Sequence, residues 1–180
     1  MLVFSVNVLN AEIVKSIQIN GNERVSDETI KIYGNIKLNK DYNESDLNKI
    51  LNNLFSTNFF EDVRVEISKN VLIINLTEFA VVRNLTIVGE ERQKYVKEIK
   101  KQILLKEKNS FIETDLSKSI DIIKSLYASL GFNFTEINSR IKKIDDRNVD
   151  LILEIIKGKE TKISKITFSG DKKVKEKRLR

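Results

Sequence analysis

The chain has 180 residues, 41% of them apolar and 32% charged, a balance typical of a folded protein rather than a disordered one. It contains neither cysteine nor histidine, which excludes disulfides and thiolate metal sites and removes the commonest general base. Because these residue types are missing, we expect no metal, cofactor or enzymatic activity. The net charge of +6 arises from interspersed basic and acidic residues, so we also expect no nucleic-acid partner.

The first eleven residues are apolar, uncharged in their side chains, and end on Ala11 just before Glu12. They resemble the second half of a secretory signal peptide, which would place the mature protein outside the cytoplasm, although the usual basic start is missing. An apolar first strand is the alternative interpretation. No other segment approaches the roughly 18 apolar residues that a membrane-spanning helix needs.

One strand pattern occurs three times, at residues 14–22, 82–90 and 163–171. Each copy alternates apolar and polar residues and ends on a glycine followed by a polar residue. The spacing of roughly 70 to 80 residues is that of a small domain. We therefore expect a fragment of a longer array, divided into residues 1–11 (signal remnant or apolar segment), 12–80 (first domain), 81–160 (second domain) and 161–180 (truncated start of a third).

Two helices are predicted after the first strand. Ser26 is placed to cap a short helix that ends at Gly34, and Asn43 is placed to cap a second one. Asn58 tolerates the left-handed conformation that ends helices. The apolar stripe of the second helix consists of Leu47, Ile50, Leu51, Leu54 and Phe55.

The periodicity then changes to that of strands. Val63, Val65 and Ile67 alternate with Arg64, Glu66 and Ser68, which predicts one strand. A turn at residues 69–70 leads to a second strand, whose apolar positions are Leu72, Ile74 and Leu76.

The second repeat follows the same order. Its first helix has the apolar stripe Val96, Ile99 and Ile103, and Thr114 is predicted to cap its second helix. Gly131 stands where Asn58 stands in the first repeat. The apolar residues Phe134, Ile137 and Ile141 are spaced irregularly, which predicts a β-bulge. Residues 145–148 form the hairpin loop, and the closing strand carries Val149, Leu151, Leu153 and Ile155.

These elements predict an α+β fold of tandem β-α-α-β-β domains. Each domain is expected to form a three-stranded mixed sheet with two helices across one face, because every helix and strand has a single apolar face to bury. The helix pair supplies the crossover between parallel strands. We expect the last strand of each domain at the centre of its sheet and the strand before it at an edge.

Two segments resemble a known family. Residues 17–25 (Ile-Gln-Ile-Asn-Gly-Asn-Glu-Arg-Val) and 54–65 (Leu-Phe-Ser-Thr-Asn-Phe-Phe-Glu-Asp-Val-Arg-Val) together resemble the first polypeptide-transport-associated (POTRA) domain of outer-membrane protein assembly factors. Residues 82 to about 160 resemble a second such domain, and 163–180 the opening of a third. Asn58 replaces the family's usual glycine, and Glu90 replaces asparagine or aspartate.

The resemblance implies a polypeptide-binding scaffold on the periplasmic side of the outer membrane, ahead of a β-barrel that is absent from this fragment. The implied partners are unfolded outer-membrane proteins, periplasmic chaperones and outer-membrane lipoproteins of the assembly complex. The POTRA region of a related transporter, of the two-partner secretion or translocation type, is the alternative.

The expected binding sites are the edge strands, because an edge exposes unpaired backbone groups to which an extended segment can add as another strand. The alternative is that charged side chains such as Arg64, Glu66, Lys142 and Lys143 merely keep the edges solvated. The candidate residues are Val63, Arg64, Val65, Glu66, Ile67, Thr135, Glu136, Ile137, Asn138 and Ser139.

Other conspicuous residues have simpler interpretations. Phe59-Phe60 is interpreted as core closure, whereas Glu61-Asp62 and Asp145-Asp146 are assigned to edge and turn positions. Lys100-Lys101 and Lys172-Lys173 are assigned to solvated faces. The linkers at residues 79–81 and 157–161 are short, which predicts limited hinging, with the junction at Gly158 the looser one.

Overall fold

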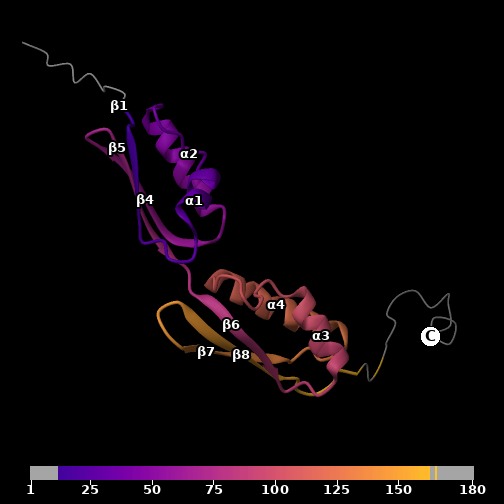
Figure 1. The fold of residues 1–180 in the computed structure, drawn as a ribbon. Helices are drawn as coiled ribbons and strands as arrows, with labels where there is room; N and C mark the ends of the chain where they lie inside the picture. Colours follow the sequence, from indigo (N-terminus) through magenta and orange to yellow (C-terminus); the bar gives the residue numbers. More distant parts are fainter. Residues whose placement is uncertain (1–11, 163–164, 166–180) are drawn as a thin grey trace, which may run out of the picture.

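A computed structural model describes residues 12–162 and 165. Figure 1 shows two similar α+β units following one another along an elongated molecule. The expected signal remnant lies outside the described residues. So do nearly all of the third copy of the strand pattern and the following Lys172-Lys173.

The first unit contains a three-stranded mixed sheet in the order β2-β5-β4. The first strand runs parallel to the central one, and the hairpin strand runs antiparallel to it. A small antiparallel pair, β1 with β3, lies beside it. The elements are β1 (Glu12–Ile13), β2 (Ser16–Asn20), α1 (Asp27–Tyr33), β3 (Asp41–Tyr42), α2 (Glu44–Phe55), β4 (Phe60–Ser68) and β5 (Val71–Glu78).

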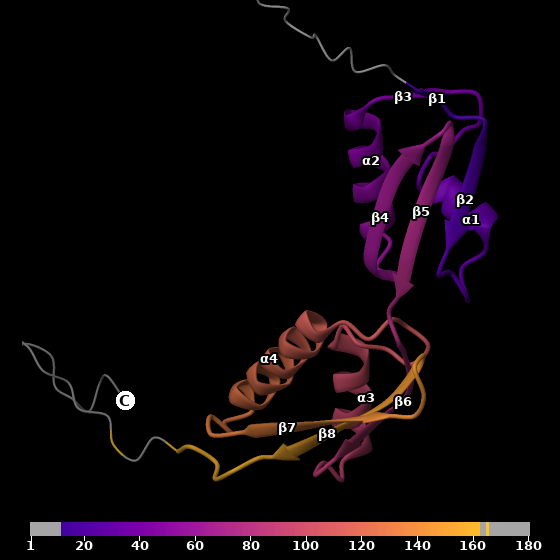
Figure 2. The ribbon, with the colours of Figure 1, turned by 90° about the vertical axis from the view of Figure 1, so that its left-hand side faces the viewer.

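The second unit repeats this topology in the order β6-β8-β7, again with one parallel and one antiparallel pair. Its helices lie on one side of the sheet, as do those of the first unit (Figure 2). The predicted α+β architecture, with the last strand central, is therefore confirmed. The elements are β6 (Val81–Val88), α3 (Gln93–Gln102), α4 (Glu113–Ser129), β7 (Glu136–Lys143) and β8 (Asn148–Ile156).

Helix starts follow local hydrogen bonding. The side chains of Ser26 and Asn43 accept backbone N–H groups, as predicted, and cap α1 and α2. The prediction that Thr114 caps α4 is wrong. The Ile112 carbonyl already accepts the N–H groups of Asp115 (3.0 Å) and Leu116 (3.1 Å), so the helix begins one residue before Thr114 and encloses it.

The predicted helix ends and the first hairpin turn are confirmed. Asn58 and Gly131 both adopt positive φ, at 58° and 91°. Lys69 and Asn70 also have positive φ values, of 50° and 65°, as the tight two-residue turn between β4 and β5 requires.

The predicted bulge in the second hairpin is wrong. β7 pairs with β8 without a register shift from Glu136 to Lys143. The irregular apolar pattern has another cause: all residues of β7 after Ile137 are exposed, so nothing selects a regular alternation there. Register shifts occur instead between Phe60 and Asp62 in β4 and between Val82 and Asn84 in β6.

Each unit has its own hydrophobic core between helices and sheet. The buried residues of the first are Val14, Ile30, Ile36, Tyr42, Ile50, Leu54, Phe60, Val63, Leu72, Ile74 and Leu76. Those of the second are Val82, Leu85, Ile99, Ile103, Leu105, Leu116, Ile123, Tyr127, Val149, Leu151, Leu153 and Ile155. Within the part of the chain that the structure describes, no helix has the length and apolarity to span a bilayer.

Candidate polypeptide-binding edges

In the first unit, β4 forms one margin of the sheet because β5 pairs with it on one side only. Its core-facing side chains are Val63, which is buried, and Val65 and Ile67, which are half-buried. Arg64 and Glu66 are exposed on the opposite face, and the Arg64 guanidinium pairs with Asp62 at 2.9 Å. Burial of the core-facing residues fixes the strand, while its outer backbone edge faces away from β5.

In the second unit, β7 is the corresponding margin and is less covered. Glu136, Asn138 and Ser139 are exposed, and Ile137 is half-buried. The exposed stretch continues to Lys143, so the sequence-based candidate residues miss the second half of this edge. Ile141 is 48% exposed although it pairs directly with Leu151 of β8, which is fully buried.

Thr135 is not an edge residue. It precedes β7 and is buried, and its hydroxyl donates to the carbonyl oxygens of Phe132 (2.9 Å) and Lys157 (3.2 Å). A small hydroxyl side chain suits this role because it can hydrogen-bond to two backbone segments that lie close together. Phe134, which precedes it, also lies outside the strand and is 74% exposed.

The opposite margins, β2 and β6, are partly occupied by the chain itself. The connection between α1 and α2 pairs with Val14, whose carbonyl accepts from Asn39 and whose N–H donates to Lys40. In the second unit Val82 makes the same two bonds with Lys108 and Asn109. These contacts lie just before β2 in the first unit and at the start of β6 in the second.

Backbone hydrogen bonds hold the linker between the units on both sides. The Phe79 N–H donates to the Phe59 carbonyl at 3.0 Å, and the Ala80 carbonyl accepts from Phe111 at 2.7 Å. Val81, placed in the linker by the sequence analysis, already belongs to β6. The connection between the two sheets is therefore only two residues long.

Glu78, at the end of β5, organises this junction. Its carboxylate accepts the N–H groups of Glu23, Arg24 and Val25 at 2.9–3.0 Å and pairs with the Arg24 guanidinium at 2.8 Å. Burial alone would raise the pKa of Glu78, but these donors outweigh it and hold the pKa below its usual range. Arg24 also donates to the Phe79 carbonyl, and Glu23 pairs with Arg147 of the second unit.

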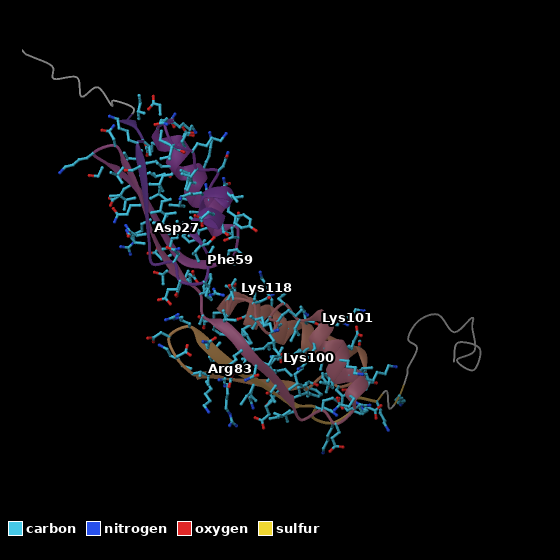
Figure 3. All side chains as sticks on the ribbon, in the orientation of Figure 1. Asp27, Phe59, Arg83, Lys100, Lys101 and Lys118 are labelled. Atoms are coloured by element: carbon cyan, nitrogen blue, oxygen red, sulfur yellow. The ribbon has the colours of Figure 1, made fainter. Side chains whose placement is uncertain are left out.

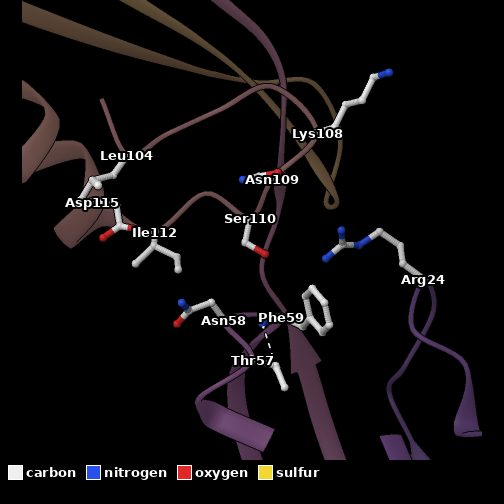
Figure 4. A pocket seen from close by; sticks show the side chains of 10 residues that line it. All are labelled: Arg24, Thr57, Asn58, Phe59, Leu104, Lys108, Asn109, Ser110, Ile112 and Asp115. Carbon is white, nitrogen blue, oxygen red and sulfur yellow. Dashed lines mark hydrogen bonds between the residues drawn. The ribbon is translucent and has the colours of Figure 1, made fainter. Parts of the chain in front are cut away.

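A cleft of about 300 Å³ lies between the units beside this junction (Figure 4). The first unit contributes Phe59 and Arg24 to it, and the second unit contributes the α3–α4 connection and the start of α4. Most of the accessible lining is polar. The lining residues are Arg24, Thr57, Asn58, Phe59, Leu104, Lys108, Asn109, Ser110, Ile112 and Asp115.

A buried charge cluster in the second unit was missed by sequence reasoning. The Glu90 carboxylate accepts the Tyr127 hydroxyl at 2.6 Å and the Arg92 N–H at 2.9 Å, and lies 3.0 Å from the Lys157 ammonium. Burial raises the pKa of Glu90, but these three partners outweigh it and lower the pKa to about 2. The available signal was the unusual glutamate after Gly89.

The remaining conspicuous residues lie where the simpler interpretations put them. Phe60 is buried, and Phe59 packs edge-on against it. Lys100 and Lys101 are exposed on α3 (Figure 3). Glu61-Asp62 lies on edge strand β4 and Asp145-Asp146 in the second hairpin loop. Among the described residues, no cluster of three or more acidic side chains could hold a metal ion.

Two tandem β-α-α-β-β units, each with a hairpin strand at an open margin, define a class of small repeated α+β modules. The POTRA family model, described as "Surface antigen variable number repeat", matches residues 12–78 and again residues 80–158. The chain therefore belongs to the POTRA family.

Two curated relatives are similar in sequence. The chain is 28% identical over 170 residues to the outer membrane protein assembly factor BamA of Neorickettsia risticii (strain Illinois), covering 94% of this chain and 23% of the relative. It is 26% identical over 168 residues to that of Neisseria meningitidis serogroup B (strain ATCC BAA-335 / MC58), covering 92% and 21%. The chain thus spans less than a quarter of either relative.

A solved structure supports the fold. The N-terminal domain of Omp85 from the cyanobacterium Thermosynechococcus elongatus superposes with a TM-score of 0.53 at 16% identity, covering 81% of this chain and 63% of that one.

Proposed function

We propose that this chain is a periplasmic polypeptide-binding scaffold of an outer-membrane β-barrel assembly machinery. Membership of the POTRA family and similarity to assembly factors support this role. The proposed partners are unfolded outer-membrane proteins, with periplasmic chaperones and outer-membrane lipoproteins as accessory partners. We propose that residues 12–80 form the first domain and that residues 81–160 form the second.

The observation that carries the proposal is the exposure of β7. Every residue from Asn138 to Lys143 is exposed, although the strand is held in register along its whole length by β8. A rigid strand with one unshared edge is a template for another strand, because its backbone groups are already positioned for pairing. β4 offers a second, more covered template in the first unit.

Pairing through the backbone suits clients of varied sequence. A net gain of about 0.5 to 1.5 kcal/mol per hydrogen bond makes capture by one edge weak and reversible. Two edges on units joined by a two-residue linker would bind a long client more tightly, because the second contact forms at a high effective concentration.

The proposal is tested by titrating the ¹⁵N-labelled chain with a peptide copied from a barrel strand. We expect the largest amide shifts in β7, over residues 136–143, and in β4, over residues 62–68. A peptide of the same sequence with N-methylated backbone amides is the control, since it keeps every side chain but cannot donate backbone hydrogen bonds. Equal shifts with both peptides, or shifts confined to other elements, would refute edge pairing.

A further inference from the structure

The helix α3 differs from the other three described helices in the charge at its start. Its N-cap residue, Arg92, makes no side-chain cap bond, and its first turn contains Lys94 but no acidic residue. A cation in the first turn is unfavourable, because it lies next to the positive end of the helix dipole. Each of the other helices has two carboxylates there: Asp27 and Glu28 in α1, Glu44 and Asp46 in α2, and Glu113 and Asp115 in α4.

Three exposed lysines, Lys94, Lys97 and Lys101, form one face of α3, which we call the lysine face. Their spacing of three and then four residues places them on the same side of the helix. The buried residue of the helix, Ile99, lies on the opposite side. Like charges three and four residues apart repel one another, so the lysine face weakens the helix that carries it.

Acidic neighbours do not offset this repulsion. Among the described residues, none of the three lysines belongs to an ion pair, whereas the adjacent Lys100 lies 3.6 Å from the Glu107 carboxylate. Glu98 follows Lys94 by four residues, but its carboxylate accepts a hydrogen bond from the Gln102 amide at 2.6 Å. Residues that oppose the local structure they belong to are expected at functional surfaces, where a partner supplies the missing compensation.

The basic charge of the second unit is concentrated around this helix. Residues 93–108 contain six lysines and two glutamates, a net charge of +4. Residues 81–92 and 109–160 together contain ten basic and eleven acidic residues, a net charge of −1. The positive potential is therefore local to α3 and the connection that follows it, and it favours an anionic partner.

We propose that the lysine face docks an acidic helix of a partner protein. Lys94 and Lys101 are seven residues apart, which corresponds to about 10 Å along the helix axis. Carboxylates at positions i, i+3 and i+7 of a helix lying along α3 have the same spacing, whereas three carboxylates on one side of a β-strand span about 14 Å. An anionic membrane fits less well, because the apolar side of α3 is buried in the core of its own unit and cannot enter a bilayer.

The test titrates the ¹⁵N-labelled 180-residue chain with two capped, alanine-rich peptides of about 18 residues, a length at which such sequences form helices. The spaced peptide carries glutamates at positions i, i+3 and i+7, and the control peptide carries the same three glutamates in consecutive positions. We expect amide shifts over residues 93–102 and about tenfold tighter binding of the spaced peptide, because only its carboxylates can face all three lysines at once. Equal affinity of the two peptides, or shifts confined to other elements, would overturn the proposal.

Two further measurements examine other occupants of the lysine face. Phosphatidylglycerol vesicles that broaden the α3 amides, when neither peptide shifts them, would assign the face to a membrane surface. Sedimentation velocity without peptide that shows self-association, lost in Lys101→Gln, would assign it to a second copy of the chain. Either result would refute docking of an acidic partner helix.

Lys94→Glu separates binding from folding. It replaces the cation at the start of α3 by an anion, so it should raise the midpoint of thermal unfolding while weakening binding of the spaced peptide by about tenfold. Lys124→Glu is the matched control, because Lys124 is an exposed lysine of α4 and its replacement changes the net charge equally. Equal weakening by both variants would show a general charge effect and contradict a site on α3.

A double variant, Lys97→Gln with Lys101→Gln, leaves the first turn of α3 unchanged. It should weaken binding of the spaced peptide without lowering the unfolding midpoint, and unchanged binding would rule out the site. The lysine face is separate from β4 and β7, so the barrel-strand peptide should shift those strands equally in every variant. Failure of the lysine-face proposal would therefore leave the proposed edge pairing intact.

Discussion

Gly21 and Gly89 occupy the same place in the two units and have φ values of 85° and 83°. A β-carbon at either would overlap the carbonyl oxygen of the neighbouring central strand, Leu76 in one unit and Ile155 in the other. Gly131 has a similar φ of 91°, but its nearest neighbour would be 3.6 Å from an added β-carbon. Substitution at Gly21 or Gly89 would therefore cause both steric overlap and backbone strain, whereas substitution at Gly131 would cause backbone strain alone.

We predict that Gly21→Ala and Gly89→Ala lower the free energy of unfolding by more than about 2 kcal/mol, because strain and overlap add. Gly131→Ala should cost only roughly 1 kcal/mol, since strain alone acts there. Urea denaturation of the three variants measures the difference. Similar losses in all three would contradict the overlap argument.

The Glu90 cluster predicts a pH dependence of stability. The pKa of Glu90 falls from 4.5 to about 2 on folding, so the carboxylate's contribution is complete above about pH 5 and is lost as the pH falls toward 2. We expect Glu90→Gln to destabilise the chain by roughly 2 to 3 kcal/mol at neutral pH and to flatten this acid limb.

Thermal unfolding measured from pH 7 to pH 3 tests this expectation. Glu91→Gln is the matched control, because Glu91 is the next residue and is exposed. An acid limb of unchanged slope in Glu90→Gln would contradict the assignment.

At the scale of elements, α2 and α4 begin in different ways. Asn43 accepts a backbone N–H from Asp46 at 3.0 Å, whereas the N-cap residue of α4 is Ile112, which makes no side-chain cap bond. We predict that Asn43→Ala costs about 1 kcal/mol of unfolding free energy. Thr114→Ala should be neutral or stabilising by up to about 0.5 kcal/mol, because alanine is the better residue inside a helix. Denaturant unfolding that shows an equal loss for Thr114→Ala would restore Thr114 as a cap.

The strands divide by position in their sheets. β5 and β8 each pair with a strand on both sides, whereas β7 pairs on one side and is exposed along most of its length. The central strands β5 and β8 are thus best suited to stabilise their units, whereas the margin strand β7 is best placed to meet a partner. The fully buried residues of the two central strands are Leu72, Ile74, Leu151 and Leu153.

At the scale of the whole molecule, we expect two sets of contacts to limit movement between the units. The two-residue connection is held by backbone bonds on both sides, and Arg147 of the second unit pairs with Glu23 of the first. Both side chains of this pair are more than half exposed, at 64% and 51%, so the pair should contribute little to folding. Its effect should be on the orientation of the units.

We predict that Arg147→Ala broadens the distribution of inter-unit angles, while the free energy of unfolding changes by less than about 0.5 kcal/mol. Residual dipolar couplings measured separately for each unit would detect the change. High salt should act on the unsubstituted chain in the same direction, because it screens an exposed pair. Couplings that fit one fixed orientation in both proteins would show that the backbone bonds alone fix the junction.

The expectation that Gly158 forms the looser junction stays a prediction. Gly158 has a φ of 67°, and its preceding residue Lys157 is held by Glu90 and Thr135. The Thr161 N–H also donates to the Gly131 carbonyl. Comparing relaxation of amides on the two sides of Gly158 with that around Phe79 would decide which junction moves more.

Local pattern alone determined the order of elements, both left-handed helix ends and the central position of the last strand, because each depends on periodicity or on one residue's preferred backbone angles. The cap at Thr114 was predicted wrongly because local backbone bonds to the Ile112 carbonyl start the helix earlier, and the bulge in β7 because the exposure of that strand is a tertiary property. Which margins are closed was decided only by tertiary structure. The Glu107 carboxylate accepts the Leu85 N–H across 22 residues of sequence, and no local pattern records that contact.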